Sequence, residues 1–227
     1  MGINARMKTP IVQTPNPVTL IGGGEIFPDD LADALARAPF LVAADGGAQA
    51  ALDRGHSPKI VIGDLDSLST TARSVLPPGA VFPICEQDST DFDKALRNIS
   101  APLVLAIGFL GRRLDHQLAA FNTLVRRADA PCILVGEQEI LFHARSGMTI
   151  DLEPGAIVSL FPMAQVSGRS DGLEWPIDGL VLAPDGRIGT SNRALGPVTL
   201  WTDSPGMLVI VPRTSLDAVM QAIAQDC

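Results

Sequence analysis

The 227-residue sequence contains no tyrosine, few aromatic residues of any kind (4%) and only three cysteines. Cys85, Cys132 and Cys227 are far apart and show none of the close pairing that a zinc site or a disulfide framework requires. We therefore expect free thiols in a reducing compartment. Basic runs are also absent, and the net charge of −8 argues against a nucleic-acid partner, which would need a positively charged patch.

Long hydrophobic runs are missing as well. The longest, PLVLAIGFLG at residues 102–111, is too short to span a bilayer. Residues 1–17 lack the apolar segment of a signal peptide, so we expect them to form a flexible tail. These absences predict a cytoplasmic protein without a membrane partner. Hydrophobic residues still make up 46% of the chain, which is typical of a compact folded protein.

Short apolar runs alternate with helix-like segments from residue 18 to about residue 136. This alternation predicts an α/β domain over residues 18–138, with a parallel Rossmann-like sheet covered by helices. The helix expected at 115–127 has apolar residues at helical spacing, and Asp115 is placed to cap its start. After about residue 140, short strands broken by glycine and proline predict an antiparallel β-sandwich domain over residues 139–227, with a helix near its end.

The stretch VIGDLDSLS at residues 61–69 places two carboxylates, Asp64 and Asp66, directly after an apolar run. If that run is a strand that continues through them, both side chains project from the same face, because side chains alternate along a strand. Two anions so close together repel unless a cation lies between them. A hard cation such as Mg²⁺ prefers one or two carboxylates together with phosphate and water oxygens.

Other polar residues follow the remaining strands of the expected sheet, at the edge where ligands bind in open α/β folds. Each motif alone has a simple structural explanation, such as a tight turn or a helix cap. Together they place glycine turns, carboxylates and two cations at one edge. Lys94 and Arg113 can neutralise phosphate oxygens, and the glycine turns let backbone N–H groups approach them.

The sequence offers little support for covalent hydrolysis, because it contains neither a nucleophile elbow nor a spaced Ser/His/Asp set. His116 is open to two interpretations: it is a general base, or it has a structural role at the start of a helix. Core packing is the simpler role for Trp175 and Trp201, although one of them can still stack on a flat ring.

Four polar stretches follow one another along the first domain: ADGGAQ at 44–49, GDLDS at 63–67, QDSTDFDKAL at 87–96 and GRRLDH at 111–116. Taken in this order, they resemble the motifs of the thiamine pyrophosphokinase family. GLEWP at 172–176 and GTSN at 189–192 resemble two further family stretches in the second domain. The resemblance implies transfer of a pyrophosphoryl group from ATP to thiamine by a homodimeric, Mg²⁺-dependent enzyme, with an α/β domain followed by a β-sandwich.

The resemblance also implies a role for particular residues. Catalysis falls to six residues: Asp45, Asp64, Asp66, Asp91, Arg113 and Asp115. Three of these are the expected metal ligands: Asp64, Asp66 and Asp91. The ATP-binding set is Gly46, Gly47, Asp88, Thr90, Lys94 and Arg113. Thiamine would contact Ser191, Asn192 and Trp175.

Two positions depart from the family pattern: Gln49 replaces an asparagine, and Arg112 replaces a glycine. Two other functions remain open on sequence grounds. One is a pyrophosphokinase of the same scaffold that acts on another acceptor, such as a pterin alcohol. The other is a nucleotide-binding module without turnover, although such a module would be expected to lose acidic ligands that this chain retains.

Overall fold

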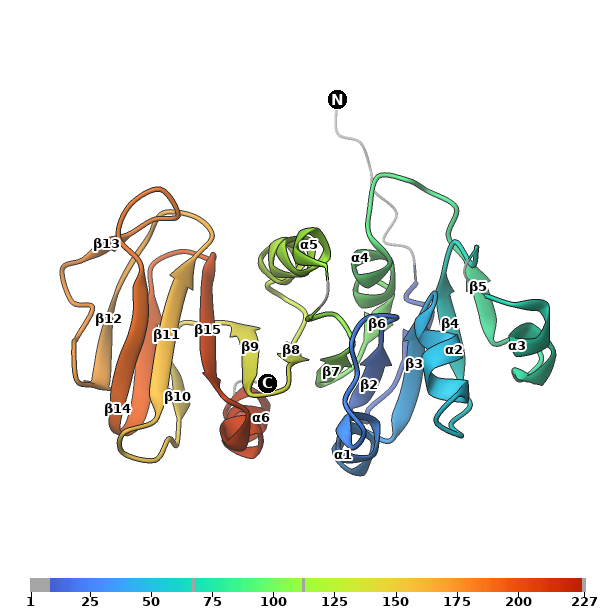
Figure 1. The fold of residues 1–227 in the computed structure, drawn as a ribbon. Helices are drawn as coiled ribbons and strands as arrows, with labels where there is room; N and C mark the ends of the chain where they lie inside the picture. The colour runs from blue at the N-terminus through green and yellow to red at the C-terminus, as the bar shows by residue number, and fades with distance from the viewer. Residues whose placement is uncertain (1–8, 67, 112, 226–227) are drawn as a thin grey trace.

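The computed structural model describes residues 9–66, 68–111 and 113–225. Its centre is a parallel sheet with the strand order β8-β7-β2-β3-β4-β5 (Figure 1). The bounds of these strands are β2 Val18–Ile21, β3 Phe40–Ala44, β4 Ile60–Gly63, β5 Val81–Pro83, β7 Val104–Ile107 and β8 Cys132–Val135. Chain order reverses between β2 and β7, so the sheet has the switch point at which open α/β sheets bind ligands.

Helices cover both faces of this parallel sheet. They are α1 Asp30–Arg37, α2 Gly47–Leu52, α3 Thr70–Val75, α4 Asp91–Leu96 and α5 Leu114–Arg126. The first three pack with one set of alternating strand residues, such as Ile21 and Ile107. The last two pack with the opposite set, such as Leu20 and Ile62. Strands buried on both faces have to be apolar throughout, which accounts for the short hydrophobic runs of the sequence.

The second half of the chain is antiparallel. Its elements are β9 Glu139–His143, β10 Met148–Ile150, β11 Ile157–Pro162, β12 Val166–Leu173, β13 Val181–Leu182, β14 Gly189–Thr202, β15 Met207–Pro212, the 3-10 turn Arg213–Ser215 and α6 Leu216–Gln225. The first residues of β14 pair with β11, whereas its last residues lie between β10 and β12. The long strand therefore links two groups of strands.

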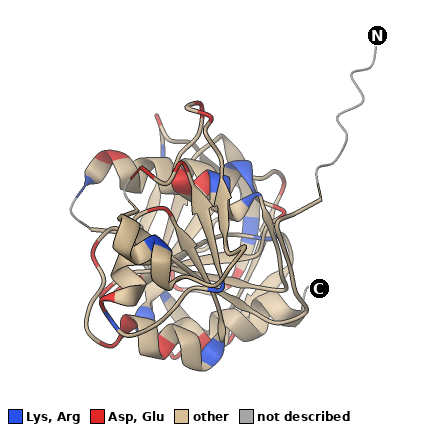
Figure 2. Cartoon of the chain, turned by 90° about the vertical axis from the view of Figure 1, so that its right-hand side faces the viewer, with Lys and Arg blue, Asp and Glu red and all other residues tan. Residues whose placement is uncertain are grey.

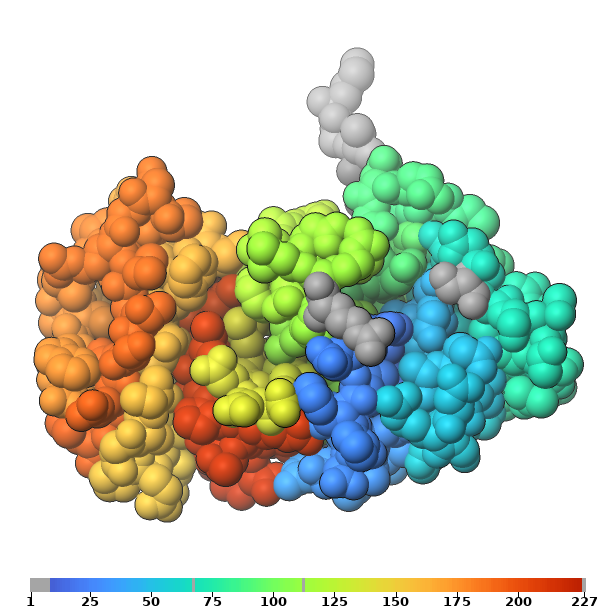
Figure 3. Space-filling model, in the orientation of Figure 1, coloured from blue at the N-terminus to red at the C-terminus, as the bar shows by residue number. Residues whose placement is uncertain are grey.

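The two halves share one mixed sheet, which the prediction of two separate domains did not include. β9 pairs antiparallel with β8, and Ile133 lies opposite Phe142 in this pair. Thirteen of the described strands belong to this sheet. Parallel pairing changes to antiparallel pairing between residues 135 and 139, next to the predicted boundary at 138/139. Figure 3 shows the two halves at opposite ends of the molecule, with the β8–β9 segment and the C-terminal helix between them.

Ion pairs add to this connection between the halves. Arg213, which follows β15, binds the buried carboxylate of Asp30 in α1 and donates to the Gly136 carbonyl oxygen at 3.1 Å. Arg37 at the end of α1 binds Asp217 in α6 at 2.6 Å. The first helix of the α/β part is thus held by the last segment of the chain.

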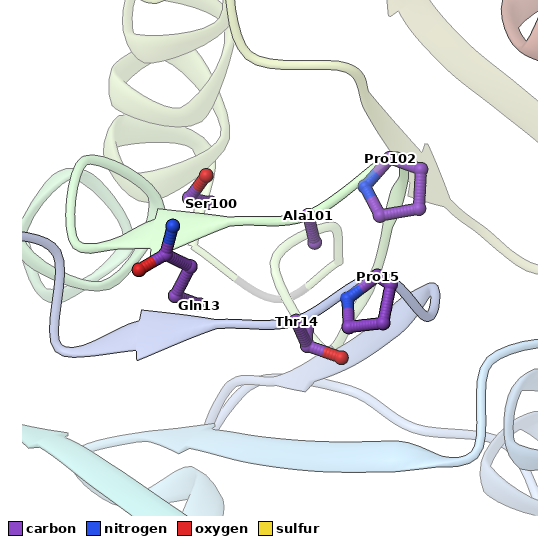
Figure 4. Close-up of a pocket in the computed structure, with 6 residues that line it drawn as sticks. All are labelled: Gln13, Thr14, Pro15, Ser100, Ala101 and Pro102. Atoms are coloured by element: carbon purple, nitrogen blue, oxygen red, sulfur yellow. The ribbon is translucent and has the colours of Figure 1, made fainter.

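The predicted tail at residues 1–17 is partly ordered. Residues 1–8 lie outside the described part, but β1 Val12–Gln13 pairs in parallel with β6 Ile99–Ser100. Val12 is buried there. The loops that follow β1 and β6 enclose an open pocket of about 380 Å³, lined by Gln13, Thr14, Pro15, Ser100, Ala101 and Pro102 (Figure 4). This pocket lies before the starts of β2 and β7, at the sheet edge opposite to the ligand-binding one.

Two further predictions concern cysteines and membranes. Cys85 and Cys132 are free thiols, as expected, and Cys227 lies outside the described residues. Among the helices that the structure describes, none has the length and hydrophobicity needed to cross a membrane.

Candidate active site

Three carboxylates meet at the carboxyl ends of β3 and β4. Oxygen atoms of Asp45, Asp64 and Asp66 lie within 4.8 Å of one another, close enough to share one cation. Asp45 follows β3 directly, and the other two follow β4. The residues fit a hard divalent cation, because carboxylate oxygens are the donors that such ions prefer.

Asp45 is the most deeply placed member of this cluster. It is 6% exposed, and its buried Oδ1 has no hydrogen-bond partner within the described part of the chain. A buried carboxylate oxygen without a partner is unfavourable unless a ligand or cation satisfies it. Asp45 was predicted as a catalytic residue, and its burial and its proximity to Asp64 and Asp66 place it in the cluster that could hold a cation.

Left-handed backbone geometry brings the cluster together. Asp45 has φ +41° and Leu65 has φ +66°, and these are two of the three described non-glycine residues with positive φ. β4 ends at Gly63, so strand alternation does not set the direction of Asp64 and Asp66. The turn at Leu65 does this instead. Such conformations raise the energy by about 1–3 kcal/mol each, and they persist where the surrounding structure requires them.

Gly63 leaves room for Asp45 because it has no side chain. A Cβ at position 63 would lie 2.8 Å from the Asp45 Cβ, which is closer than two carbon atoms can pack. The glycine of GDLDS therefore has a steric role in the site, in addition to ending the strand. The same stretch includes Ser67, which lies outside the described residues.

Lys94 joins the cluster to α4. Its ammonium group donates to Asp64 at 3.0 Å and to Asp91 at 3.1 Å, and the side chain is almost fully buried. Burial opposes its charged form, but the hydrogen bonds to the two carboxylates outweigh this and raise the Lys94 pKa. Lys94 thus brings a permanent positive charge to the carboxylates, although the lysine itself is shielded from solvent.

The two partners of Lys94 differ in acidity. The hydrogen bond from Lys94 lowers the pKa of Asp64, and the backbone N–H of Asp66 adds to this effect. Burial raises the pKa of Asp91 despite its bond to Lys94, and the negative charges of Asp64 and Asp45 raise it further. Of the two partners of Lys94, Asp91 therefore has the stronger tendency to take up a proton.

Three predicted site residues, Thr90, Asp88 and Asp91, lie in or just before α4, and each has different surroundings. Thr90 is the N-cap of α4 and accepts a hydrogen bond from the Asp93 N–H at 3.3 Å. Asp88 is exposed in the preceding loop. Asp91 lies close enough to the three-carboxylate cluster to interact with it, but its nearest partner is Lys94. Its role as a metal ligand stays a prediction.

Arg113 and Asp115 form a pair of their own at the start of α5. The guanidinium binds the carboxylate through two hydrogen bonds, of 3.1 and 2.5 Å, and both side chains are about two-thirds exposed. This hydrogen bond lowers the pKa of Asp115 and raises that of Arg113. Asp115 was expected to cap the helix, but Arg113 occupies the N-cap position, and its side chain makes no capping hydrogen bond to the helix backbone. Arg112 lies outside the described residues, and His116 is exposed.

Gly46 and Gly47 open α2 directly after Asp45. A Cβ on Gly47 would lie 2.0 Å from the carbonyl oxygen of Ile21, so α2 and β2 pack without any space for a side chain. Gln49 was noted as a departure from the family pattern. Its amide accepts from Ser69, the N-cap of α3, at 3.3 Å and donates to Asp53 at 2.7 Å. It therefore connects α2 to the loop that carries Asp64 and Asp66.

An ion-pair network lies behind α4 and was not among the features predicted from the sequence. Asp93 is 1% exposed and receives two hydrogen bonds from Arg127, at 2.8 and 3.2 Å. Arg97 lies 3.6 Å from the same carboxylate and binds Glu86 at 2.6 Å. An acidic residue inside an apolar helical stretch was the available signal. Figure 2 shows how acidic and basic segments are interspersed around this end of the molecule.

The predicted thiamine residues lie in the antiparallel half. Ser191 has φ +60°, and its N–H donates to the Ser159 hydroxyl at 3.0 Å. Asn192 is buried, and its amide binds the backbone of Trp175, whose side chain is 54% exposed. These three residues are therefore neighbours, although the Asn192 amide binds backbone of the chain itself. Their contact with thiamine stays a prediction.

Fold and site together define an α/β protein with carboxylates and a buried lysine at the carboxyl ends of its parallel strands. Proteins of this class bind phosphorylated ligands at that edge. A family model described as "Thiamin pyrophosphokinase, catalytic domain" matches residues 31–134. Over this stretch, which is just under half of its length, the chain is similar to the thiamine pyrophosphokinase family.

One known relative and two solved structures illustrate this similarity. Thiamine pyrophosphokinase 3 of Oryza sativa subsp. japonica is 27% identical, and the match covers 74% of this chain and 77% of the relative. The crystal structure of thiamin pyrophosphokinase from Geobacillus thermodenitrificans has a TM-score of 0.71 at 24% identity, covering 86% of this chain and 96% of that one. Yeast thiamin pyrophosphokinase has a TM-score of 0.71 at 19% identity, covering 93% and 90%.

Proposed function

We propose that this protein is a thiamine diphosphokinase, which transfers the pyrophosphoryl group of ATP to the hydroxyethyl oxygen of thiamine and releases AMP. The observation that carries the proposal is the junction of the Asp45, Asp64 and Asp66 carboxylates with the buried Lys94 at one sheet edge. Phosphoryl transfer depends on positioning and charge neutralisation, and these groups can supply both.

In the proposed reaction the hydroxyl of thiamine attacks the β-phosphorus of ATP. Asp45, Asp64 and Asp66 would hold Mg²⁺, and Asp91 remains a further predicted ligand; the bound ion would supply charge neutralisation to the phosphates. Lys94 keeps Asp64 ionised and orients Asp91. Arg113 is exposed at the start of α5, where it can bind a phosphate if it exchanges Asp115 for that ligand.

A carboxylate must also orient the attacking hydroxyl and accept its proton. Asp91 and Asp66 are the candidates for this role. The raised pKa of Asp91 favours Asp91, because a base with higher proton affinity is more effective near neutral pH. Its bond to Lys94 fixes the carboxylate while leaving one oxygen for the substrate.

Several finer assignments belong to the same proposal. The antiparallel half would form a β-sandwich that binds thiamine through Ser191 and Trp175, and the parallel half would bind ATP in a Rossmann-like manner. The protein would act as a cytoplasmic homodimer.

An assay for AMP release tests the function. Purified protein, ATP and Mg²⁺ are incubated with thiamine, with a pterin alcohol, or with no acceptor. Release of AMP only with thiamine is expected. Release only with the pterin alcohol would identify the other acceptor class, and no release with any acceptor would identify a module without turnover.

The variant Asp66→Asn tests the carboxylate cluster in the same assay. We expect it to lose AMP release by at least about a hundredfold, since it removes one charge from the predicted metal site. Asp217→Asn is the matched control, because Asp217 pairs with Arg37 on the surface of α6. Near-normal turnover of Asp66→Asn would contradict the metal assignment.

A further inference from the structure

The β11–β14 pair contains an irregularity next to Asn192. Val158 lies opposite Asn192 and Leu160 lies opposite Gly189, so one residue of β11 faces two residues of β14. This is a β-bulge, and Ser191 occupies it in the left-handed conformation. Bulges of this kind change the direction of the side chains that follow them. Here the next side chain is that of Asn192.

The amide of Asn192 is used almost completely by neighbouring backbone. Its Oδ1 accepts from the Trp175 N–H at 3.1 Å and from the Arg193 N–H at 2.8 Å. Its Nδ2 donates to the Trp175 carbonyl oxygen at 2.7 Å. The side chain is buried, so it presents little surface to a ligand.

Asn192 binds both polar backbone groups of Trp175. The regular β12–β14 pairing ends near Leu173 and Ala194, followed by one more bond from the Glu174 N–H to the Arg193 carbonyl oxygen. Trp175 comes next, and Pro176 after it has no N–H to continue the ladder. The side-chain amide takes the place of a peptide group of a neighbouring strand and holds Trp175 where the strand would otherwise end.

We propose that Asn192 is a positioning residue for acceptor binding, which fixes the exposed Trp175 ring and does not itself contact thiamine. The inference rests on the proposed function. Thiamine has an aromatic pyrimidine and a positively charged thiazolium ring, and an exposed indole can bind either by stacking or by a cation–π interaction. If the strand end were free, the indole ring would not be held in one orientation. The loop that carries it would have to be ordered on each binding event, which lowers the affinity.

Trp175 fluorescence allows a test that does not need catalysis. In a Trp201→Phe background Trp175 is the remaining tryptophan of the chain, which contains two. We expect Asn192→Ala to lower its fluorescence anisotropy in the absence of ligand and to raise its accessibility to acrylamide. Arg193→Ala is the matched control, since it removes a neighbouring side chain that is more than half exposed and leaves the amide contacts in place. Unchanged anisotropy and accessibility in Asn192→Ala would overturn the inference.

Thiamine titrations separate this inference from the proposed function. Thiamine should quench Trp175 in the parent protein, and Asn192→Ala should weaken thiamine binding by about tenfold or more while the KM for ATP stays unchanged. Asn192→Asp should act in the same direction, because a carboxylate cannot donate to the Trp175 carbonyl oxygen. Absence of thiamine binding in the parent would contradict the proposed function, and with it the assignment of thiamine as the ligand.

A double-mutant comparison shows whether Asn192 acts through the ring. In a Trp175→Ala background, Asn192→Ala should cause no further loss of thiamine binding, because the group that it positions is gone. Full additivity of the two losses would instead mean that Asn192 contacts thiamine directly, and would overturn the proposal. Thermal unfolding of each variant confirms that the folded protein is being compared.

Discussion

Gly47 has no space for a side chain, although sequence reasoning gave it a role in ATP binding. The structure adds a packing reason for this glycine, since a methyl group there would meet the Ile21 carbonyl oxygen at 2.0 Å. A role at the phosphates and a role in packing are compatible, because Gly47 lies at the start of α2 directly beside the site.

We therefore expect Gly47→Ala to lower the free energy of unfolding by about 3 kcal/mol or more, because backbone atoms cannot move aside as a flexible side chain can. Gly186→Ala is the matched control, since its nearest neighbour would lie at an ordinary 3.5 Å. Urea unfolding measures both variants. Equal stability of the two would show that α2 can shift away from β2 at little cost.

His143 is a half-buried polar residue that was not predicted to have a role. Its Nε2 accepts the Gly206 N–H at 2.9 Å, so the neutral ring carries its proton on Nδ1. Burial lowers its pKa from the ordinary value of 6.5, and the charge of Arg145 lowers it further. The unfolded chain therefore takes up this proton at a higher pH than the folded one.

This difference predicts a pH dependence of stability. The contribution of neutral His143 is fully present above about pH 6.5 and is lost as the pH falls through the lowered pKa of the folded state. His143→Gln keeps an acceptor but cannot be protonated. Between about pH 7.5 and about pH 5.5, its free energy of unfolding should fall less than that of the parent. Parallel curves for the two proteins in urea titrations would contradict the assignment.

At the level of elements, the apolar runs predicted the strands well because parallel strands are buried on both faces. The direction of Asp64 and Asp66 could not be predicted in this way. We expected strand alternation to align them, but β4 ends first and Leu65 turns the chain. A left-handed leucine is unfavourable by itself, so only the surrounding packing can select it.

The helix α5 also shows that a local sequence pattern can predict an element without predicting which of its faces is buried. Its range, Leu114–Arg126, differs by one residue from the expected 115–127. Leu118 fits the apolar periodicity but is 53% exposed, whereas Thr123 is buried. Periodicity predicts that a helix forms, but which of its faces is covered depends on the neighbouring α4 and on strands β9 and β15, which lie far away in the sequence.

The contact between α4 and α5 contains an ion pair whose loss should destabilise the protein. The Asp93 carboxylate is buried and receives two bonds from Arg127, so Asp93→Ala leaves a partly buried cation without a partner. We expect a loss of about 3 kcal/mol in the free energy of unfolding, at the lower end for a buried pair because Arg127 is partly exposed.

Asp217→Ala provides the matched control for this prediction. It removes the same group from a surface pair with Arg37, and its loss should stay under about 1 kcal/mol. Chemical denaturation of both variants gives the comparison. Equal losses would mean that the contact between α4 and α5 is no stronger than an ordinary surface ion pair.

For the whole molecule, the sequence predicted a change from α/β to antiparallel structure at 138/139, and parallel pairing gives way to antiparallel pairing between residues 135 and 139. It did not predict that the halves share a sheet, because strand pairing between distant segments leaves no local signal. β8 pairs with β9, and Arg213 binds α1 across the same junction. These contacts make separate unfolding of the halves unfavourable.

We therefore expect a single unfolding transition. Both tryptophans lie after residue 139, whereas the helices α1 to α5 lie before it. Tryptophan fluorescence thus reports the antiparallel half, and far-ultraviolet circular dichroism is dominated by the helices of the parallel half. The two curves should coincide in urea if the protein is one cooperative unit. Two separated midpoints would show independent domains.

The pairing of β8 with β9 also has a consequence for synthesis of the chain. On a ribosome, β8 emerges before β9, and all four of its residues are apolar and are buried in the finished protein. Until β9 arrives, β8 is an open hydrophobic edge, which can add a strand from another chain and start aggregation. The short connection at residues 136–138 keeps this interval brief, because the protecting strand follows almost at once.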